Sequence, residues 1–125
     1  MPVEPDEQQV AALTARAGGP DDGPIVMLNL NTYRDRDVYL RYGMVALGKV
    51  AEAGGRVLWG AQAPMTVVGA EACDEVIAVW YPSRAAFLAM VADPEYGAAL
   101  PDRVAGLERA QLICCDAGDA TAFTA

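Results

Sequence analysis

The sequence predicts one α+β domain of the ferredoxin-like type, a βαββαβ sandwich. Its periodic segments follow in the order strand, helix, strand, strand, helix, strand, which is the split βαβ pattern. A chain of 125 residues has room for one hydrophobic core. An apolar fraction of 54% with 21% charged residues is typical of a globular protein rather than a disordered one.

Residues 1–23 are predicted to form a helical extension and a linker ahead of this domain. Asp6 is placed to cap a helix that runs to Arg16, and Gly18 and Gly19 end it. The stretch GGPDDGP that follows is typical of a linker. We therefore expect a domain over 24–118 and a short tail over 119–125.

Residues 24–33 are predicted to form the first strand, with two alternating sets of side chains. Val26, Leu28 and Leu30 are uniformly apolar, so we expect them to face the helices. The second set is mixed and indicates a face that is buried but not wholly dry; it comprises Ile25, Met27, Asn29, Asn31 and Tyr33.

The longest helix is predicted over 35–53, with Asp35 or Asp37 at its start. Its apolar residues recur at helical spacing and predict a stripe that packs on the sheet, namely Leu40, Met44, Leu47 and Ala51. Gly54 and Gly55 are expected to end the helix through a left-handed cap.

The second half of the chain predicts two more strands, a helical region and a final strand. Residues 56–69 resemble a strand interrupted at Gly60 and Pro64, and Glu71, Asp74 and Glu75 are expected in a solvated acidic turn. The pattern over 75–81 predicts the third strand. Ser83 is placed to cap a helix over 84–91, and Asp93 and Pro94 begin a further one. Another helical turn or two is expected over 101–108, before the last strand over 109–116.

A homodimer is predicted because the third strand is apolar on both faces. Neither face carries a charged residue between positions 76 and 81: one face has Val76, Ala78 and Trp80, and the other has Ile77, Val79 and Tyr81. Helices in this fold cover one face of the sheet only. A second copy of the same sheet would cover the other face.

Charge and composition argue against several functions. The net charge of −8 disfavours nucleic acid and acidic membranes as partners. No apolar run approaches the roughly 20 residues that a membrane span needs, and the acidic N-terminus does not resemble a secretory signal, so we expect a cytoplasmic protein. The chain has 3 cysteines and 0 histidines, which disfavours a disulfide framework and a metal site. We expect no metal and no cofactor.

Several segments resemble a bacterial family of unknown function in the dimeric α+β barrel superfamily. They are PIVMLNLNTY, GGRVLWG, EVIAVWYPSRAAFLAMVADPEY and DRVAGLERAQLI, and the motif YPSRAAF followed by DPEY is the most specific of them. Related branches are EthD-like, NIPSNAP-like and antibiotic-biosynthesis monooxygenase proteins. The resemblance implies the fold and a face-to-face dimer of sheets. Asp102 stands before Arg103 where many relatives carry histidine, so no histidine mechanism or haem site is carried over.

Five polar or aromatic residues and one charge are the candidates for chemistry. Arg103 could hold a planar anion, or it could form an ion pair with Asp102, Asp93 or Glu95. The tyrosines near the first helix could donate a proton, or simply bond to the backbone; they are Tyr33, Tyr39 and Tyr42. Asn29 needs a partner that could be a ligand or the second subunit. Trp59 could form the wall of a pocket.

Two functions of different classes fit these residues. The first is a small-molecule enzyme without metal or cofactor, of isomerase, cyclase or cofactor-free monooxygenase type, acting on a hydrophobic substrate that is aromatic or polyketide-like. Arg103 would hold the oxyanion, and Tyr33 or Tyr42 would donate the proton; Asn29, Trp59 and Tyr39 would bind the substrate. The alternative is a protein that binds a small ligand without turnover, or a dimerisation module that docks through 6–16.

Overall fold

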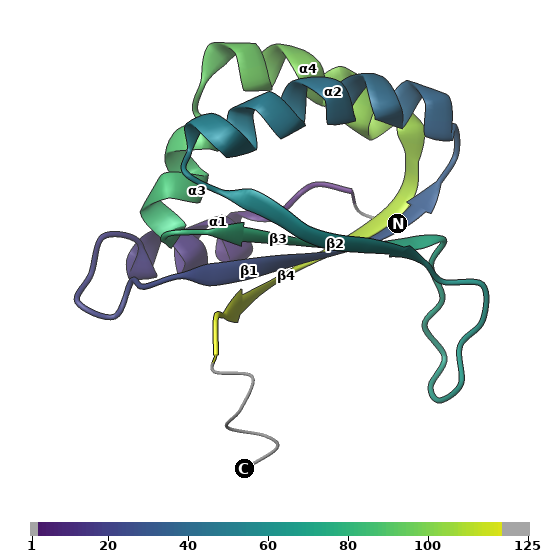
Figure 1. Ribbon diagram of the computed structural model, residues 1–125, viewed down its shortest axis with the longest axis horizontal. Helices are drawn as coiled ribbons and strands as arrows, with labels where there is room; N and C mark the ends of the chain where they lie inside the picture. The colour runs from purple at the N-terminus through teal and green to yellow at the C-terminus, as the bar shows by residue number, and fades with distance from the viewer. Residues whose placement is uncertain (1–2, 119–125) are drawn as a thin grey trace.

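The computed structural model describes residues 3–118 as a four-stranded antiparallel sheet with four helices, which is the predicted ferredoxin-like α+β fold. The strand order is β2-β3-β1-β4. Figure 1 shows α2 and α4 side by side over one face of the sheet. The elements are α1 (Glu7–Arg16), β1 (Ile25–Tyr33), α2 (Arg36–Glu52), β2 (Arg56–Gln62), β3 (Glu75–Tyr81), α3 (Arg84–Val91), α4 (Pro94–Gly106) and β4 (Leu107–Asp116). The tail predicted over 119–125 lies outside the described residues.

The predicted caps begin four of these helices. Asp6, Asp35, Ser83 and Asp93 each accept a hydrogen bond from a backbone amide of the helix that follows. Gly54 ends α2 with a φ of 81°, which is the predicted left-handed conformation. Near the C-terminal end two boundaries differ from the prediction: α4 is one continuous helix that contains Pro101, and β4 begins at Leu107.

The two faces of β1 are the reverse of the prediction. Ile25, Met27 and Asn31 are buried beneath the helices, while Val26, Leu28 and Leu30 lie on the opposite face and are partly exposed. The mixed set can be buried because its polar members bind other side chains within the layer. Asn31, at 2% exposure, donates from Nδ2 to the Tyr39 hydroxyl over 3.1 Å.

The prediction that an aliphatic stripe of α2 packs on the sheet is also wrong. Leu40, Met44 and Leu47 are exposed, Met44 to 76%. The helix instead buries Tyr39, Tyr42, Lys49 and Val50, because it packs against α4 as well as the sheet. At their crossing, a Cβ built on Gly106 would lie 2.5 Å from the Tyr39 backbone nitrogen, so only glycine permits this approach.

The second predicted strand is shorter than expected. It ends at Gln62, and Val67 and Val68 belong to the loop 63–74 rather than to the sheet. The expected irregularity is present as a register shift between Val57 and Trp59. The backbone amide of Ala63 donates to the Asp74 carbonyl and closes the loop at its base. Figure 1 shows this loop projecting from the sheet on the side away from α2 and α4.

The segment before β1 is attached to the domain at defined points. Leu13 of α1 packs against the core, and α1 contacts α3. The Asp22 carboxylate accepts hydrogen bonds from the backbone amides of Gly18, Arg84 and Ala85, at 2.7, 2.7 and 3.1 Å. Asp22 therefore links the linker to the N-terminus of α3.

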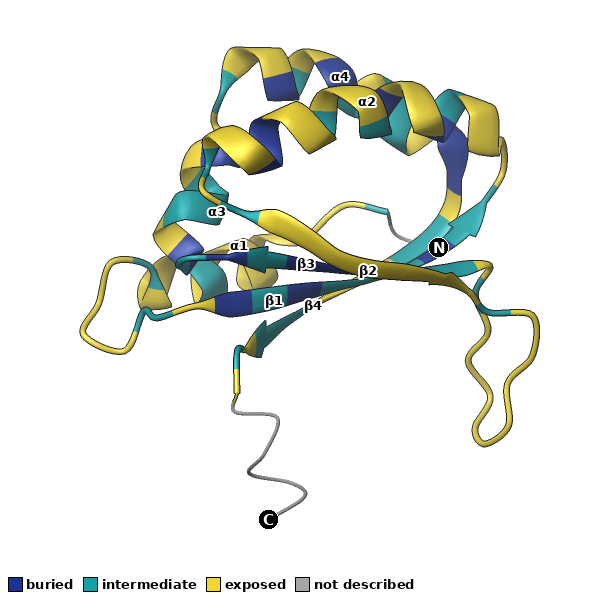
Figure 2. Ribbon diagram, in the orientation of Figure 1, coloured by how far each residue is buried: buried dark blue, intermediate teal, exposed yellow. Residues whose placement is uncertain are grey.

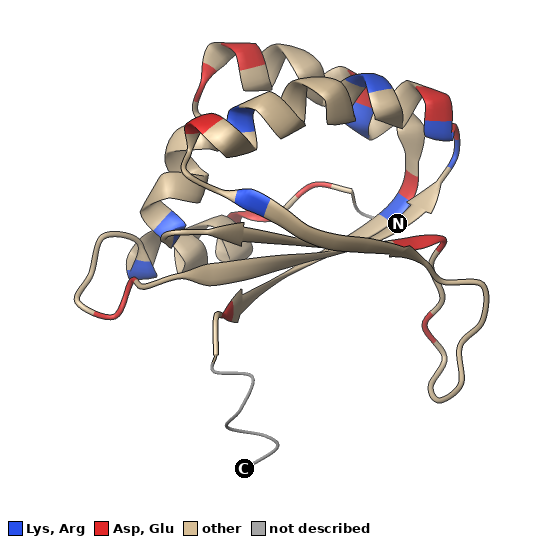
Figure 3. Ribbon diagram, viewed as in Figure 1, with Lys and Arg blue, Asp and Glu red and all other residues tan. Residues whose placement is uncertain are grey.

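The face of the sheet opposite the helices carries an apolar row. The strand registers align Trp59, Ala78, Leu28 and Ile113 across the four strands. Trp59 is 51% exposed and Ile113 is 42% exposed. Figure 2 shows exposed residues along β2, and Figure 3 shows that the middle parts of the strands carry no charge. This row is an apolar surface that the described chain leaves partly exposed to water.

Candidate functional site

Four tyrosines form a continuous cluster between the sheet and the helix pair. Tyr33 ends β1, Tyr39 and Tyr42 lie on the inner side of α2, and Tyr96 comes from α4. Successive ring centroids are 5.0, 5.3 and 5.8 Å apart in the order Tyr33, Tyr39, Tyr42, Tyr96. The structure therefore brings together the three predicted tyrosines and adds a fourth.

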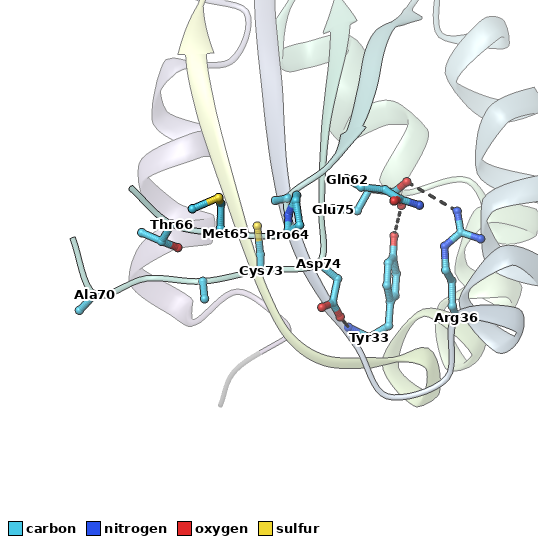
Figure 4. A pocket seen from close by; sticks show the side chains of 12 residues that line it. Tyr33, Arg36, Gln62, Pro64, Met65, Thr66, Ala70, Cys73, Asp74 and Glu75 are labelled. Atoms are coloured by element: carbon cyan, nitrogen blue, oxygen red, sulfur yellow. Dashed lines mark hydrogen bonds and ion pairs between the residues drawn. The ribbon is translucent and has the colours of Figure 1, made fainter. Parts of the chain in front are cut away.

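At the outer end of this cluster, Tyr33 forms one wall of a pocket of about 650 Å³. Its hydroxyl donates to the Glu75 carboxylate over 2.5 Å, and the Arg36 guanidinium lies 3.6 Å from the same carboxylate. Figure 4 shows these three side chains close together at one side of the pocket. The other lining residues are Gln62 and residues 63–66, 70 and 72–74 of the loop.

Burial raises the pKa of three tyrosines of this cluster. It raises the pKa of Tyr33 well above its ordinary value, and the hydrogen bond to Glu75 raises this pKa further. Burial likewise raises the pKa of Tyr39 and of Tyr42. At neutral pH each phenol is therefore a hydrogen-bond donor, and Tyr33 is the one whose hydroxyl points at a carboxylate on a pocket wall.

The two asparagines of β1 have different roles. The Asn29 amide donates to the backbone carbonyls of Met27 and Ile77 at 3.3 and 3.2 Å, so its polar hydrogens bond to the sheet itself. Asn31, which the sequence pattern did not single out, donates to the Tyr39 hydroxyl. Its amide also lowers the pKa of Tyr33. Asn31 therefore positions Tyr39, whose ring packs against Tyr33.

Arg103 lies on the inner side of α4, beside the cluster but away from the pocket. Its guanidinium donates to the Val3 carbonyl, and its charge lowers the pKa of Tyr39 and Tyr42. The ion-pair partners expected for it are engaged elsewhere. Asp102 pairs with Arg41, and Asp93 and Glu95 pair with Lys49.

Trp59 is not part of this cluster, because it belongs to the exposed row on the other face of the sheet. The three cysteines are free, and Cys73 lines the pocket. Within residues 3–118, no three His, Cys, Asp or Glu side chains gather in a way that could hold a metal ion. None of the helices described is long and apolar enough to cross a bilayer.

Sequence reasoning missed Glu75 and Tyr96, in addition to Arg36 and Asn31. Glu75 was expected in a solvated turn, yet its side chain is 18% exposed and accepts from Tyr33. Tyr96 shares a 2.6 Å hydrogen bond with Tyr42 inside the core. The alternation along β3 was a usable signal for the first, because it places Glu75 on the same face as Val79 and Tyr81, which are buried. Tyr96 gave no such local signal.

The architecture and the site define a ferredoxin-like α+β protein, and comparisons with solved structures agree. A protein of unknown function from Rhodopseudomonas palustris is 30% identical, with a TM-score of 0.86, and the match covers 94% of this chain and 97% of that one. A NIPSNAP domain protein from Burkholderia xenovorans is 15% identical, with a TM-score of 0.55 and coverage of 77% and 96%. A dimeric ferredoxin-like protein of unknown function from Thermobifida fusca is 14% identical, with a TM-score of 0.51 and coverage of 81% and 97%.

The chain belongs to the family described as Domain of unknown function (DUF1330), whose model matches residues 25–116. This confirms the predicted resemblance to a bacterial family of unknown function, and monooxygenase-like proteins are also among the structures that share the fold. A search of curated proteins found no match. The matches below 25% identity carry information on the fold alone, so activity has to be argued from the site.

Proposed function

We propose that the protein is a homodimeric enzyme that moves a proton on a small, largely apolar molecule, without a metal or a cofactor. The observation that carries this proposal is the 2.5 Å hydrogen bond from the Tyr33 hydroxyl to the Glu75 carboxylate in the wall of a pocket. A phenol and a carboxylate side by side supply a general acid and a general base at one point.

The proton transfer would run between these two groups and an enolisable carbonyl compound. The Tyr33 hydroxyl would turn from Glu75 to the substrate carbonyl oxygen and stabilise the negative charge that develops there. The freed Glu75 carboxylate would take the proton from the adjacent carbon. Return of that proton to another carbon conjugated with the carbonyl completes an isomerisation. In a cyclisation the enolate carbon would instead attack a second carbonyl carbon of the same substrate, and the proton would pass from Glu75 to the new alkoxide oxygen. Neither course changes the overall oxidation state of the substrate. Arg36, with its guanidinium 5.9 Å from the Tyr33 ring centroid, would support the charged intermediate.

The pocket lining supports an uncharged substrate. Asp74 and Glu75 bring two carboxylates against one guanidinium from Arg36, so the polar end carries a formal charge of −1. Much of the rest of the lining is apolar, including Ala63, Pro64 and Met65. An anionic substrate would meet repulsion here, whereas a neutral apolar ketone would not.

The homodimer follows from the apolar row on the open face of the sheet. Trp59, Leu28 and Ile113 lie in this row, and a second copy related by a two-fold axis would cover them. The dimeric protein from Thermobifida fusca has the same fold, which is consistent with this arrangement.

Arg103 and Tyr42 take positioning roles in this proposal rather than the direct ones expected from the sequence. Tyr42 shares its hydroxyl hydrogen bond with Tyr96, and Arg103 donates to the Val3 carbonyl. Neither residue lines the pocket. We assign the chemistry to Tyr33 and Glu75 and expect Arg103 and Tyr42 to hold the inner tyrosines in place.

The test is hydrogen exchange into carbonyl compounds, which detects proton abstraction whichever ketone the pocket accepts. A panel of enolisable ketones, aromatic and aliphatic, is incubated with the protein in D2O, and exchange of the C–H next to the carbonyl is followed by proton NMR. We expect catalysed exchange of at least one compound, a loss of about 100-fold or more in Glu75→Gln and a large loss in Tyr33→Phe. Tyr81→Phe is the matched control, because Tyr81 bonds to Met90 within the core and does not line the pocket.

A ligand-binding protein without turnover is the second candidate. It is favoured by the position of Tyr42, one of the expected proton donors, because its hydroxyl bonds to Tyr96 inside the core and does not line the pocket. It predicts that the same ketones raise the melting temperature without any exchange. That result would refute catalysis. If no compound shows exchange and none raises the melting temperature, the pocket is refuted as a ligand site.

A further inference from the structure

The loop 63–74 carries an apolar tip that the described chain leaves almost fully exposed. Val67 is 85% exposed and Val68 is 90% exposed, and Met65 beside them is 76% exposed. Branched aliphatic side chains at such exposure lose the stabilisation that burial would give. An isolated exposed valine needs no explanation, but three large apolar residues at one tip indicate a contact surface.

This loop is held in a defined shape rather than hanging free. The Thr66 hydroxyl donates to the Glu71 carbonyl over 2.6 Å, which closes the turn around Gly69 at a φ of 98°. At its base the Asp74 amide donates to the Asn31 carbonyl, and Arg109 of β4 donates to the Ala72 carbonyl over 2.6 Å. These bonds define the shape of the loop and hold its base, but they leave the side chains of its tip exposed to water.

The direction of the loop selects its partner. Figure 1 shows that it extends beyond the sheet on the side away from α2 and α4, which is the side of the apolar row that contains Trp59 and Ile113. Arg109, which lies on that same face by its register, ties the loop to it. The tip and the row thus lie on the same side of the sheet, and a second sheet that covers the row would also meet the tip.

The same loop lines the candidate pocket. Residues 63–66, 70 and 72–74 form one side of it, opposite Tyr33 and Arg36 (Figure 4). A contact that fixes the tip would therefore also fix this wall. Without that contact, the wall would rest only on the hydrogen bonds at its base and within its turn.

We infer that the tip of loop 63–74 packs through Val67 and Val68 on a second copy of this chain, so that each subunit fixes the pocket wall of the other. This inference rests on the homodimer of the proposed function and adds that the pocket is complete only in the dimer. Two-fold symmetry makes the contact reciprocal, so one substitution removes it twice.

The experiment compares the full-length protein with the double variant Val67→Ser/Val68→Ser. Dimer dissociation is measured by sedimentation velocity across a dilution series, and amide exchange of residues 63–74 is followed by mass spectrometry at the same concentrations. In the natural sequence, exchange of the loop should slow as the dimer forms. The double variant should raise the dissociation constant by about 10-fold or more and keep the loop in fast exchange at every concentration.

The matched control is Met44→Ser/Leu47→Ser on the outer side of α2, where both side chains are likewise apolar and exposed. It should leave both readouts unchanged. A natural protein that stays monomeric at tens of micromolar would refute the homodimer of the proposed function. A dimer of unchanged affinity in the loop variant, with loop exchange independent of concentration, would refute this inference alone.

Discussion

Replacing Gly106 with alanine should disrupt the contact between α4 and α2 that supports the tyrosine cluster. A Cβ at this position would lie 2.5, 2.7 and 2.8 Å from the nitrogen, Cβ and Cα of Tyr39. These atoms are backbone or directly attached to it, so they cannot turn aside as the end of a long side chain could. The Gly106 carbonyl also accepts from the amides of Arg34 and Asp35 at 2.9 and 3.1 Å, and a shift of α4 would strain both bonds.

The magnitude follows from the costs of overpacking. Inserting a methyl group into a closed contact costs about 1–3 kcal/mol, and here the neighbours are rigid, so we take the upper part of that range. In a helix interior, alanine is favoured over glycine by about 1 kcal/mol in helix propensity. Gly106 is the last residue of α4, so only a small part of this gain applies here. The expected net loss in the free energy of unfolding is about 2 kcal/mol, which corresponds to a fall of roughly 8 °C in melting temperature for a domain of this size.

Gly97→Ala in the same helix is the matched control. A Cβ there meets nothing within 4 Å, so the propensity gain should appear alone as a rise of up to about 1 kcal/mol. Both variants are measured by thermal and urea unfolding at one fixed protein concentration, because dimer formation would make the melting temperature depend on concentration. If Gly106→Ala proves as stable as Gly97→Ala, the close approach of the two helices is wrong.

Three further predictions test the core, the linker and the open face. Asn31→Leu leaves the buried Tyr39 hydroxyl without its partner and should cost about 1–3 kcal/mol, part of which Tyr39→Phe should recover in a double-mutant cycle by urea unfolding; equal costs in both backgrounds would contradict the bond. Hydrogen bonds from the Gly18, Arg84 and Ala85 amides hold the pKa of Asp22 below its ordinary value, so its stabilisation is present above about pH 4 and is lost as the pH falls through the folded-state pKa. Asp22→Asn should therefore be less stable than the natural protein at pH 6, and the difference between their free energies of unfolding should narrow toward pH 3. A difference that stays constant with pH would show that Asp22 does not titrate this way. Trp59→Lys should dissociate the dimer in sedimentation without loss of helical circular dichroism, whereas Met44→Lys should leave it intact, and a dimeric Trp59→Lys would place the interface elsewhere.

The elements of this fold could be predicted because their signals are local. Asp35 and Ser83 each lie three residues before the amide that they cap, and Gly54 supplies a conformation that few other residues adopt. Such signals depend on a few neighbouring residues. They therefore do not depend on how the rest of the chain packs.

The covered face of β1 could not be chosen from apolarity alone. A strand alternates its side chains, so its pattern defines two sets but not the side on which the helices lie. Uniform apolarity of Val26, Leu28 and Leu30 favoured the wrong set, because a dimer interface can need an apolar face as much as a core does. The mixed set is buried since Asn31 and Tyr39 satisfy each other, a pairing that requires α2 to be in place.

The same physical reason explains the aliphatic stripe of α2. The aliphatic pattern predicted that Leu40 and Met44 face the sheet, whereas the buried side is formed by the tyrosines and Val50. Tyrosine combines a large apolar ring with one polar atom, and a hydrophobicity pattern undervalues it when that atom has a partner. The partners of Tyr33 and Tyr42 lie 42 and 54 positions away in the sequence, beyond any local pattern.

The hydroxyl partners in the tyrosine cluster distinguish the tyrosines that stabilise the core from the one that can contact a ligand. Tyr39 with Asn31 and Tyr42 with Tyr96 are pairs inside the core, and none of these residues lines the pocket. Both members of the third pair, Tyr33 and Glu75, do line it, so a bound molecule could replace one partner without unfolding anything. Removing a hydroxyl from either inner pair should therefore lower stability first, whereas removing the Tyr33 hydroxyl should lower proton exchange first. This difference in access, rather than the number of tyrosines, is what favours Tyr33 and Glu75 for the proposed reaction.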